Sequence, residues 1–189
     1  MPVMSRPQKK LTYADFLLFP EDGNRHELID GVHYVTPSPY IPHQIIVGRL
    51  FVAIANFLAT RKDLGRMFLS PVDVVMSDHD VVVPDFTFVA ADQQSILTEA
   101  NVQGSPALVV EVLSPSTRRR DEGIKRNLFA QQGVKEYWLV DRKAMQVSIC
   151  WRAEDGTFPT IATLTQDDQL TTPLLPGFVL SMRDLFGEM

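Results

Sequence analysis

The chain has 189 residues, of which 45% are hydrophobic, and it carries a formal net charge of −5. This length can supply the core of one domain and hardly enough for two. The negative charge argues against a protein that coats nucleic acid without specificity, because binding to phosphates requires a basic surface.

Neither export nor a membrane span is indicated by the sequence. Residues 1–10 are polar and lack the apolar region of a signal peptide, and no apolar run approaches the roughly 18 residues of a membrane helix. The single cysteine, Cys150, cannot form an intrachain disulfide, which favours a reducing cytoplasm. We expect a cytoplasmic protein with no membrane partner, in which residues 1–10 are loose and residues 11–189 form a single domain.

The N-terminal part predicts a short helix followed by a β-hairpin. Thr12 and Asp15 have the spacing of a capping box, which would begin a helix over residues 13–18. Residues 25–29 and 32–36 are expected to be two strands, because a tight Asp-Gly turn separates them.

The first long helix is expected over residues 42–62, with its apolar side chains on one face. They recur at i, i+3, i+4, i+7 and i+11, at Val47, Leu50, Phe51, Ile54 and Leu58. Extended segments follow at 66–69, 72–76 and 81–89, and a mixed connection with a short helix is expected over 90–104.

The second half begins with the apolar run 107–113, which predicts a central strand covered on both faces. A helix is expected over 118–132, with Gly133 at its C-terminal end. Strands are expected at 135–140 and 145–151, paired with each other. The order of helix, three strands, helix and strand indicates an α/β domain with a central mixed sheet flanked by helices, preceded by the short helix and the hairpin.

Two of these strands are interrupted by a carboxylate. Asp85 and Glu111 each lie in an otherwise apolar segment, where an ionised and unpaired acid would cost several kcal/mol. Each acid therefore needs a cation or a basic partner, and acids on neighbouring strands could converge on one Mg²⁺ or Mn²⁺. Pro84 suits a strand start or a bulge that presents a side chain. The alternative is that each acid faces solvent or forms a structural ion pair.

Pro84-Asp85, followed by the apolar strand with Glu111, resembles the PD-(D/E)XK nuclease superfamily. More closely, the chain resembles the Uma family of restriction-endonuclease-like proteins, over residues 10 to 187. The stretches that carry this resemblance are ELIDG at 27–31, SPVD at 70–73, VPD at 83–85, VEVLSPS at 110–116, GVKEYWLVD at 133–141 and PGF at 176–178.

This resemblance implies a restriction-endonuclease-like fold and a metal-dependent endonuclease that hydrolyses phosphodiester bonds in DNA. Asp85 and Glu111 would bind Mg²⁺ or Mn²⁺, and the backbone carbonyl of Val112 or Leu113 would complete the coordination. The metal would activate water and neutralise the scissile phosphate.

In one respect the chain departs from the superfamily, which has a lysine two residues after the second acid. Here that residue is Leu113, so the ammonium must come from elsewhere. Lys125 is the best candidate, because it lies on the following helix and could extend its charge into the cleft. A solvated helix lysine is an equal alternative. The resemblance also makes Glu27 a candidate for a third catalytic acid, and a plain surface glutamate is the alternative.

Weaker candidates are His43 and the basic run. His43 could contact phosphate or orient water, although a polar residue at a helix start is the more ordinary interpretation. Arg118, Arg119 and Arg120 could hold a DNA backbone, although a run of three is more often a solvated face.

Three classes of function therefore stay open. The first is the nuclease. The second is a binding or interaction module on the same fold that has lost catalysis, favoured by Leu113 and by the acidic net charge. The third is a sugar hydrolase that uses two carboxylates, which ranks below the others because no aromatic sugar platform is evident. A homodimer is expected for the nuclease, since a duplex has two strands to cut and twofold dimers are the commonest oligomers.

Overall fold

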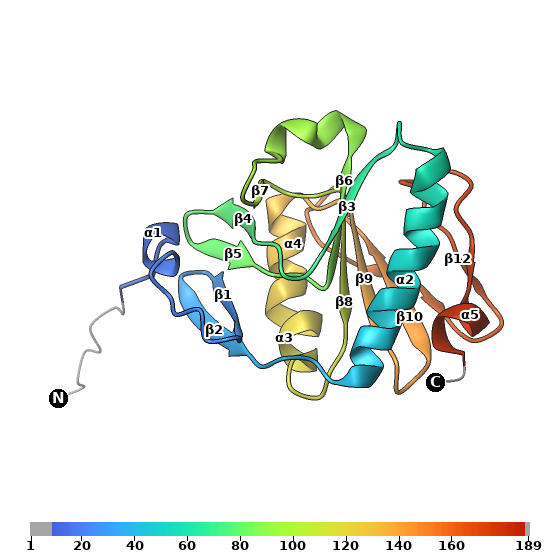
Figure 1. The fold of residues 1–189 in the computed structure, drawn as a ribbon, viewed down its shortest axis with the longest axis horizontal. Coiled ribbons are helices and arrows are strands. Elements are labelled where there is room, and N and C mark those ends of the chain that lie inside the picture. The colour runs from blue at the N-terminus through green and yellow to red at the C-terminus, as the bar shows by residue number, and fades with distance from the viewer. Residues whose placement is uncertain (1–8, 188–189) are drawn as a thin grey trace.

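The computed structural model describes residues 9–187, which form two main β-sheets with helices between and beside them (Figure 1). The six-stranded sheet has the order β11-β10-β9-β8-β6-β3, with bounds β3 Gly65–Leu69, β6 Phe86–Ala90, β8 Leu108–Val112, β9 Glu136–Asp141, β10 Gln146–Trp151 and β11 Thr160–Leu164. The five-stranded sheet has the order β2-β1-β5-β4-β7, with bounds β1 Arg25–Ile29, β2 Val32–Thr36, β4 Val74–Ser77, β5 Asp80–Val82 and β7 Val102–Gln103. A small sheet pairs β12 (Gln169–Leu170) with β13 (Leu180–Ser181).

The helical elements follow the predicted pattern closely. Their bounds are α1 Tyr13–Phe16, α2 Ile41–Thr60, a 3-10 turn η1 Ala91–Ile96, α3 Arg118–Arg120, a π turn η2 Asp121–Lys125, α4 Arg126–Gln132 and α5 Met182–Phe186. Thr12 and Asp15 form the predicted capping box of α1. The elements α3, η2 and α4 follow one another without a break over residues 118–132, as predicted. The π turn between α3 and α4 was not predicted.

The predicted core order of helix, three strands, helix and strand is confirmed. After α2, the strands β3, β6 and β8 pair antiparallel in sequence, and β8 pairs parallel with β9 after the intervening helix. Every residue of β8 is buried, as predicted for a central strand covered on both faces. A parallel pair needs such a crossover helix, because no short turn can reverse the chain twice.

The two faces of the six-stranded sheet are covered by different helices. On one face α2 packs with its buried residues Ile46, Val47, Leu50, Ile54 and Leu58. On the other face α4 lies between the two main sheets and joins the core of both (Figure 1). The residues that begin these helices are thereby brought to one end of the sheet.

The prediction of one strand over residues 81–89 is wrong. The segment divides into β5, which belongs to the five-stranded sheet, and β6, which belongs to the six-stranded sheet. Pro84 lies at the break, where its missing N–H removes a ladder hydrogen bond. The chain thus passes from one sheet to the other at Val83, Pro84 and Asp85.

The expectation that no segment has the properties of a membrane span needs correction for α2. By length and composition alone this helix is long and apolar enough to cross a membrane, because its few polar residues do not offset the apolar ones. A helix of a soluble core meets the same test, and α2 buries one face against the sheet. Its Arg49 donates to the backbone oxygens of Leu185 and Gly187.

The N-terminal segment expected to be loose, residues 1–10, lies outside the described residues except for its last two. Lys10 forms an ion pair with Asp30, and the amide of Leu11 donates to the oxygen of Gly31 at 3.0 Å. The strands β7, β11, β12 and β13 were not anticipated, since they are short or polar on their exposed side.

Candidate active site

Asp85 and Glu111 lie at the same end of the pairing between β6 and β8. The last pair of this ladder joins Phe86 to Val110, so Asp85 directly precedes that pair on one strand and Glu111 directly follows it on the other. The charge of Asp85 acts on Glu111. The amide of Val112 donates to Oδ2 of Asp85 at 2.9 Å. Both acids are 3% exposed. The structure therefore brings together the two acids that the sequence singled out.

Asp85 is held by two basic side chains from other elements. Nη1 of Arg25, at the start of β1, lies 2.7 Å from Oδ1, and Nε2 of His43, in the first turns of α2, lies 2.9 Å from Oδ2. Burial by itself would raise the pKa of Asp85, but the hydrogen bond from His43 and the nearby charges lower that pKa to about 2. Asp85 is thus ionised and accepts the hydrogen bond from Nε2 of His43.

Lys125 is buried with its ammonium beside Glu111. Its side chain is 2% exposed, and Nζ lies 2.8 Å from Oε1 of Glu27, in an ion pair with Glu111 and 3.9 Å from Asp121. Burial opposes the charge of Lys125, but these three carboxylates raise its pKa above the usual value. Lys125 is therefore no solvated helix lysine, and its ammonium lies beside Glu111.

The π turn η2 explains how a helix residue reaches this position. It spans Asp121–Lys125, and the residues at both of its ends are buried. Turns of this kind are rare and occur frequently at functional sites. Asp121 was not identified from the sequence, although its place four residues before Lys125 puts the two on one helix face.

Glu27 completes the surroundings of Lys125. Its Oε1 accepts hydrogen bonds from the amide of Val83 at 3.0 Å and from Lys125, and its Oε2 lies 3.4 Å from Arg120. Burial would raise the pKa of Glu27, but Lys125 and Arg120 together lower it. Glu27 is therefore an ionised partner that fixes the position of the ammonium.

The basic run at the start of α3 divides among different surroundings. Arg120 pairs with Glu27, donates to Thr36 and lies over the ring of Tyr34. Arg118 donates to Asp141 at 2.6 Å and to a second acid on its own helix, whereas Arg119 is exposed. Arg120 turns inward, so it is neither a residue of a solvated face nor free to hold a DNA backbone. The sequence could not show this inward turn.

The cluster holds one more carboxylate than permanent cations. Besides His43 it contains Glu27, Asp85, Glu111 and Asp121 against Arg25, Arg120 and Lys125. Burial, and then the neighbouring acids, raise the pKa of Glu111 well above its usual value in spite of Lys125. Oε1 of Glu111 is buried and accepts no hydrogen bond of regular geometry. A divalent cation would correct this shortage of positive charge.

The oxygen atoms available at the site suit a hard cation. Mg²⁺ binds carboxylate and carbonyl oxygens and keeps several waters, so few protein ligands suffice. In an extended strand the N–H and C=O of one residue point the same way, so the carbonyl of Val112 is directed to the side of Asp85. The amide of Leu113 instead donates to Val140 on β9. Within residues 9–187, no three or more His, Cys, Asp or Glu side chains are grouped to hold a metal together.

A family model described as "Uma2: Putative restriction endonuclease" matches residues 13–183. The chain belongs to the Uma2 family. This confirms the family that the sequence motifs predicted, and it makes the chain a nuclease-like protein.

Proteins similar to this Uma2 chain include one matched by sequence and one matched by structure. "Uncharacterized protein slr1290" of Synechocystis sp. (strain ATCC 27184 / PCC 6803 / Kazusa) is 28% identical over 157 residues, which are 80% of each chain. The crystal structure of a putative nuclease belonging to DUF820 from Anabaena variabilis ATCC 29413 superposes with a TM-score of 0.76 at 21% identity, covering 93% of this chain and 97% of that one. The predicted α/β, restriction-endonuclease-like fold is confirmed.

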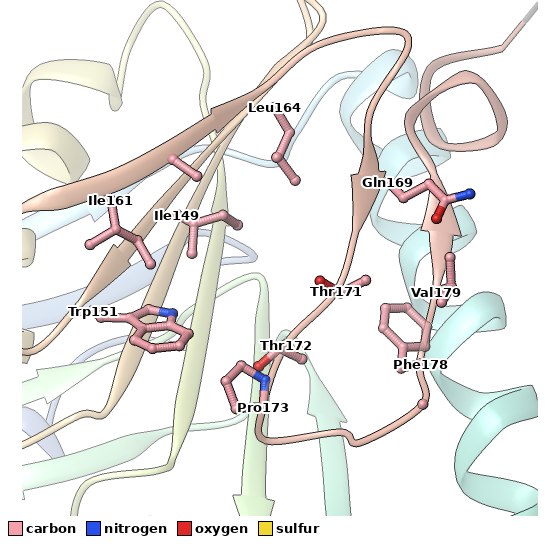
Figure 2. A pocket seen from close by; sticks show the side chains of 12 residues that line it. Ile149, Trp151, Ile161, Leu164, Gln169, Thr171, Thr172, Pro173, Phe178 and Val179 are labelled. Atoms are coloured by element: carbon pink, nitrogen blue, oxygen red, sulfur yellow. The ribbon is translucent and has the colours of Figure 1, made fainter.

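Two cavities of the Uma2 chain share Arg25 and His43, the basic partners of Asp85. One of about 320 Å³ is lined by Asp85 with Arg25, His43 and Gln44, and another of about 120 Å³ also contains Arg25 and His43. A cavity of about 510 Å³ lies elsewhere, between β10, β11 and the C-terminal segment (Figure 2). No charged side chain lines that cavity, so its chemistry does not suit phosphodiester cleavage.

Proposed function

We propose that this Uma2 chain is a Mg²⁺- or Mn²⁺-dependent endonuclease that hydrolyses phosphodiester bonds in DNA. One observation carries the proposal: Asp85, Glu111 and Lys125 converge at the end of the six-stranded sheet, in a buried cluster with one more carboxyl group than permanent cations. Membership of a family described as restriction endonucleases supports it.

Asp85 and Glu111 would hold the cation through their carboxylates, and the carbonyl of Val112 would provide a further oxygen. When bound, the cation would lower the pKa of a water molecule and neutralise the scissile phosphate. Lys125 would stabilise the negative charge that develops on the phosphate or orient the attacking water. Glu27 would act as a positioning residue, because its carboxylate contacts Lys125 directly.

His43 and Arg25 would fix the orientation of Asp85. Both donate to its oxygens, so each removes a rotation that would carry the carboxylate away from Glu111. Ordered ligand carboxylates are commonly supported by such outer hydrogen bonds, whose loss weakens metal affinity.

Cleavage of plasmid DNA in Mg²⁺ or Mn²⁺ tests the proposal. Asp85→Asn keeps the shape of the side chain and removes its charge, so cleavage is expected to fall at least about a hundredfold. Glu136→Gln is the matched control, since Glu136 is equally buried but bonds to Trp138 and Thr172, away from the cluster. Equal cleavage by wild type and Asp85→Asn would remove the proposal.

A second candidate is a DNA-binding module on the same fold without catalysis. Two observations favour it: Leu113 stands where the superfamily has its lysine, and both oxygens of Asp85 are already engaged. This candidate predicts DNA binding that survives Asp85→Asn and no cleavage with either metal. Calorimetric titration with Mn²⁺ separates the candidates, because only the nuclease requires cation binding that depends on Asp85.

The cellular location, the partner and the oligomeric state of the nuclease are also part of the proposal. We propose a cytoplasmic protein whose partner is DNA and which acts as a homodimer, so that two copies address the two strands. Sedimentation of the protein with and without duplex DNA tests the dimer, and a monomer in both conditions would contradict it.

A further inference from the structure

A small pocket beside Asp85 has a lining suited to an anion. Its polar side chains come from β1, from the end of β2, from the loop and the start of α2 that follow, and from the turn at 114–116. They include Arg25, Thr36, Ser38, His43, Ser114 and Ser116. No carboxylate lines it. The chain has a net charge of −5, and the acidic cluster lies beside this pocket. The lining of hydroxyl and nitrogen groups distinguishes the pocket from that acidic cluster.

Two nitrogen atoms at this pocket lack partners. Nε of Arg25 and Nδ1 of His43 are buried and form no hydrogen bond, although both side chains are tied to Asp85 through their other nitrogens. The side chain of His43 is 10% exposed. Buried polar atoms are almost always hydrogen-bonded, so such orphans need an explanation. Nε of Arg25 always carries a proton, so the partner that it lacks is an acceptor.

The start of α2 contributes to the same pocket. Tyr40, which lines it, is the N-cap residue of this 20-residue helix and makes no capping hydrogen bond with its side chain. The positive end of the helix dipole therefore meets the pocket beside Arg25, and this arrangement favours anions.

The size of the pocket limits what it can take. Its volume is about 120 Å³, somewhat less than the roughly 150 Å³ of a cavity that holds a six-atom benzene ring. A phosphate group has five heavy atoms, so it fits, whereas a whole nucleoside does not. The pocket therefore matches the phosphate of a nucleotide whose sugar and base stay outside.

We propose that this pocket is a subsite for a phosphate group of the nucleic acid, adjacent to the phosphate that is cleaved. The inference rests on the proposed function, because Arg25 and His43 each contact Asp85 and also line the pocket, which places it one side chain away from the reacting centre. The guanidinium fork of Arg25 and the serine hydroxyls supply the donors that phosphate oxygens accept. The group bound is either an internal phosphodiester or a terminal 5′-phosphate.

The test measures binding of a fluorescent oligodeoxythymidine by anisotropy in EDTA, where no cleavage occurs. Ser116→Glu puts a carboxylate into the pocket at an exposed loop position, and Arg119→Gln, at an exposed position outside the lining, changes the net charge by the same amount. Ser116→Glu is expected to weaken binding about tenfold, because like charges then meet at close range. Arg119→Gln is expected to weaken it less than about threefold, as a screened surface charge does.

Three forms of the oligonucleotide identify the group that binds. A penalty from Ser116→Glu with the 5′-hydroxyl form assigns the pocket to an internal phosphodiester, and a penalty only with the 5′-phosphorylated form assigns it to a strand end. With neutral methylphosphonate linkages and a 5′-hydroxyl end, the penalty is expected to vanish.

Other outcomes would overturn the subsite. These are equal losses in Ser116→Glu and Arg119→Gln, no loss in Ser116→Glu, the same loss with the neutral oligonucleotide, or no measurable binding by wild type. Failure of the proposed nuclease is distinguishable, because absent cleavage together with a specific penalty in EDTA would leave the subsite in place. Cleavage by the wild type without that penalty would leave the nuclease and remove the subsite.

Discussion

At the scale of single residues, the cluster around Lys125 balances burial against charge. An ammonium that is 2% exposed persists because three carboxylates surround it, and at least Glu27 is ionised to receive it. Such buried pairs add little net stability, but removing one partner leaves the other uncompensated. The cluster is therefore sensitive to the loss of its single lysine.

Lys125→Met is expected to lower the free energy of unfolding by about 3 to 5 kcal/mol, because Glu27 and Asp121 lose their cation in a buried setting. Urea denaturation measures the change. Adding Glu27→Gln to Lys125→Met should recover part of the loss, as coupled sites do.

Lys135→Met is the control for this prediction. Lys135 pairs with Asp92 at 3.6 Å, but its side chain is 52% exposed, so its loss should cost less than about 1 kcal/mol. A Lys125→Met protein as stable as Lys135→Met would contradict the charge balance described for the cluster.

The candidate site could be predicted in part from single residues. Asp85 and Glu111 stood out because each is a carboxylate in an apolar strand. Arg25 was missed, although it precedes Glu27 by two residues and so lies on the same face of β1. The inward turn of Arg120 and the π turn at Asp121 depend on tertiary packing, which no local pattern records.

At the scale of elements, backbone geometry rather than hydrophobic pattern decides where the segments end. The apolar residues of 81–89 suggested one strand, but Pro84 divides them between two sheets. Helix α4 ends at Gly133, whose φ of 89° lies in the left-handed region. The sequence identified that glycine correctly, because few other residues adopt this conformation.

Two glycines test this dependence on geometry. A methyl group added at Gly48 or at Gly133 meets no atom within 4 Å, so space is equal at both sites. Gly133→Ala should destabilise the protein by about 1 kcal/mol because of its left-handed φ, and Gly48→Ala should stabilise α2 by about 0.5 to 1 kcal/mol. Thermal denaturation measures both, and changes of the same sign would contradict the explanation.

The hairpin of β1 and β2 carries a pH-sensitive pair of histidines. Nδ1 of His26 lies 2.9 Å from Nε2 of His33, and Phe19 stacks on His33 with ring centroids 4.0 Å apart. Burial and then the neighbouring His26 lower the pKa of His33 below 6.5. At a pH between the lowered pKa and 6.5, the folded chain thus binds fewer protons than the unfolded one. The stability that neutral His33 contributes is therefore lost as the pH falls from about 6.5 through the lowered pKa.

The expected consequence is a lower melting temperature at about pH 5.5 than at about pH 7.5. His33→Gln cannot be protonated, so its melting temperature should depend less on pH over the same interval. An identical pH dependence in wild type and His33→Gln would show that the hairpin histidines contribute nothing to it.

At the scale of the whole molecule, the site exists only because distant segments meet at one end of the six-stranded sheet. β1 supplies Arg25 and Glu27, α2 supplies His43, the passage between the sheets supplies Asp85, and the helix after β8 supplies Lys125. The sequence predicted this core order from periodicity. It could not predict the division into two sheets, since that depends on long-range strand pairing.

The central claim is that Asp85 and Glu111 share one divalent cation. A crystal of the wild-type protein soaked in Mn²⁺ and measured at the manganese edge tests it most directly. The claim predicts one anomalous peak between the two carboxylates, within about 2.0 to 2.3 Å of an oxygen of each, and no such peak in Asp85→Asn. Absence of manganese between them in the wild type, or a peak that persists in Asp85→Asn, would contradict the claim.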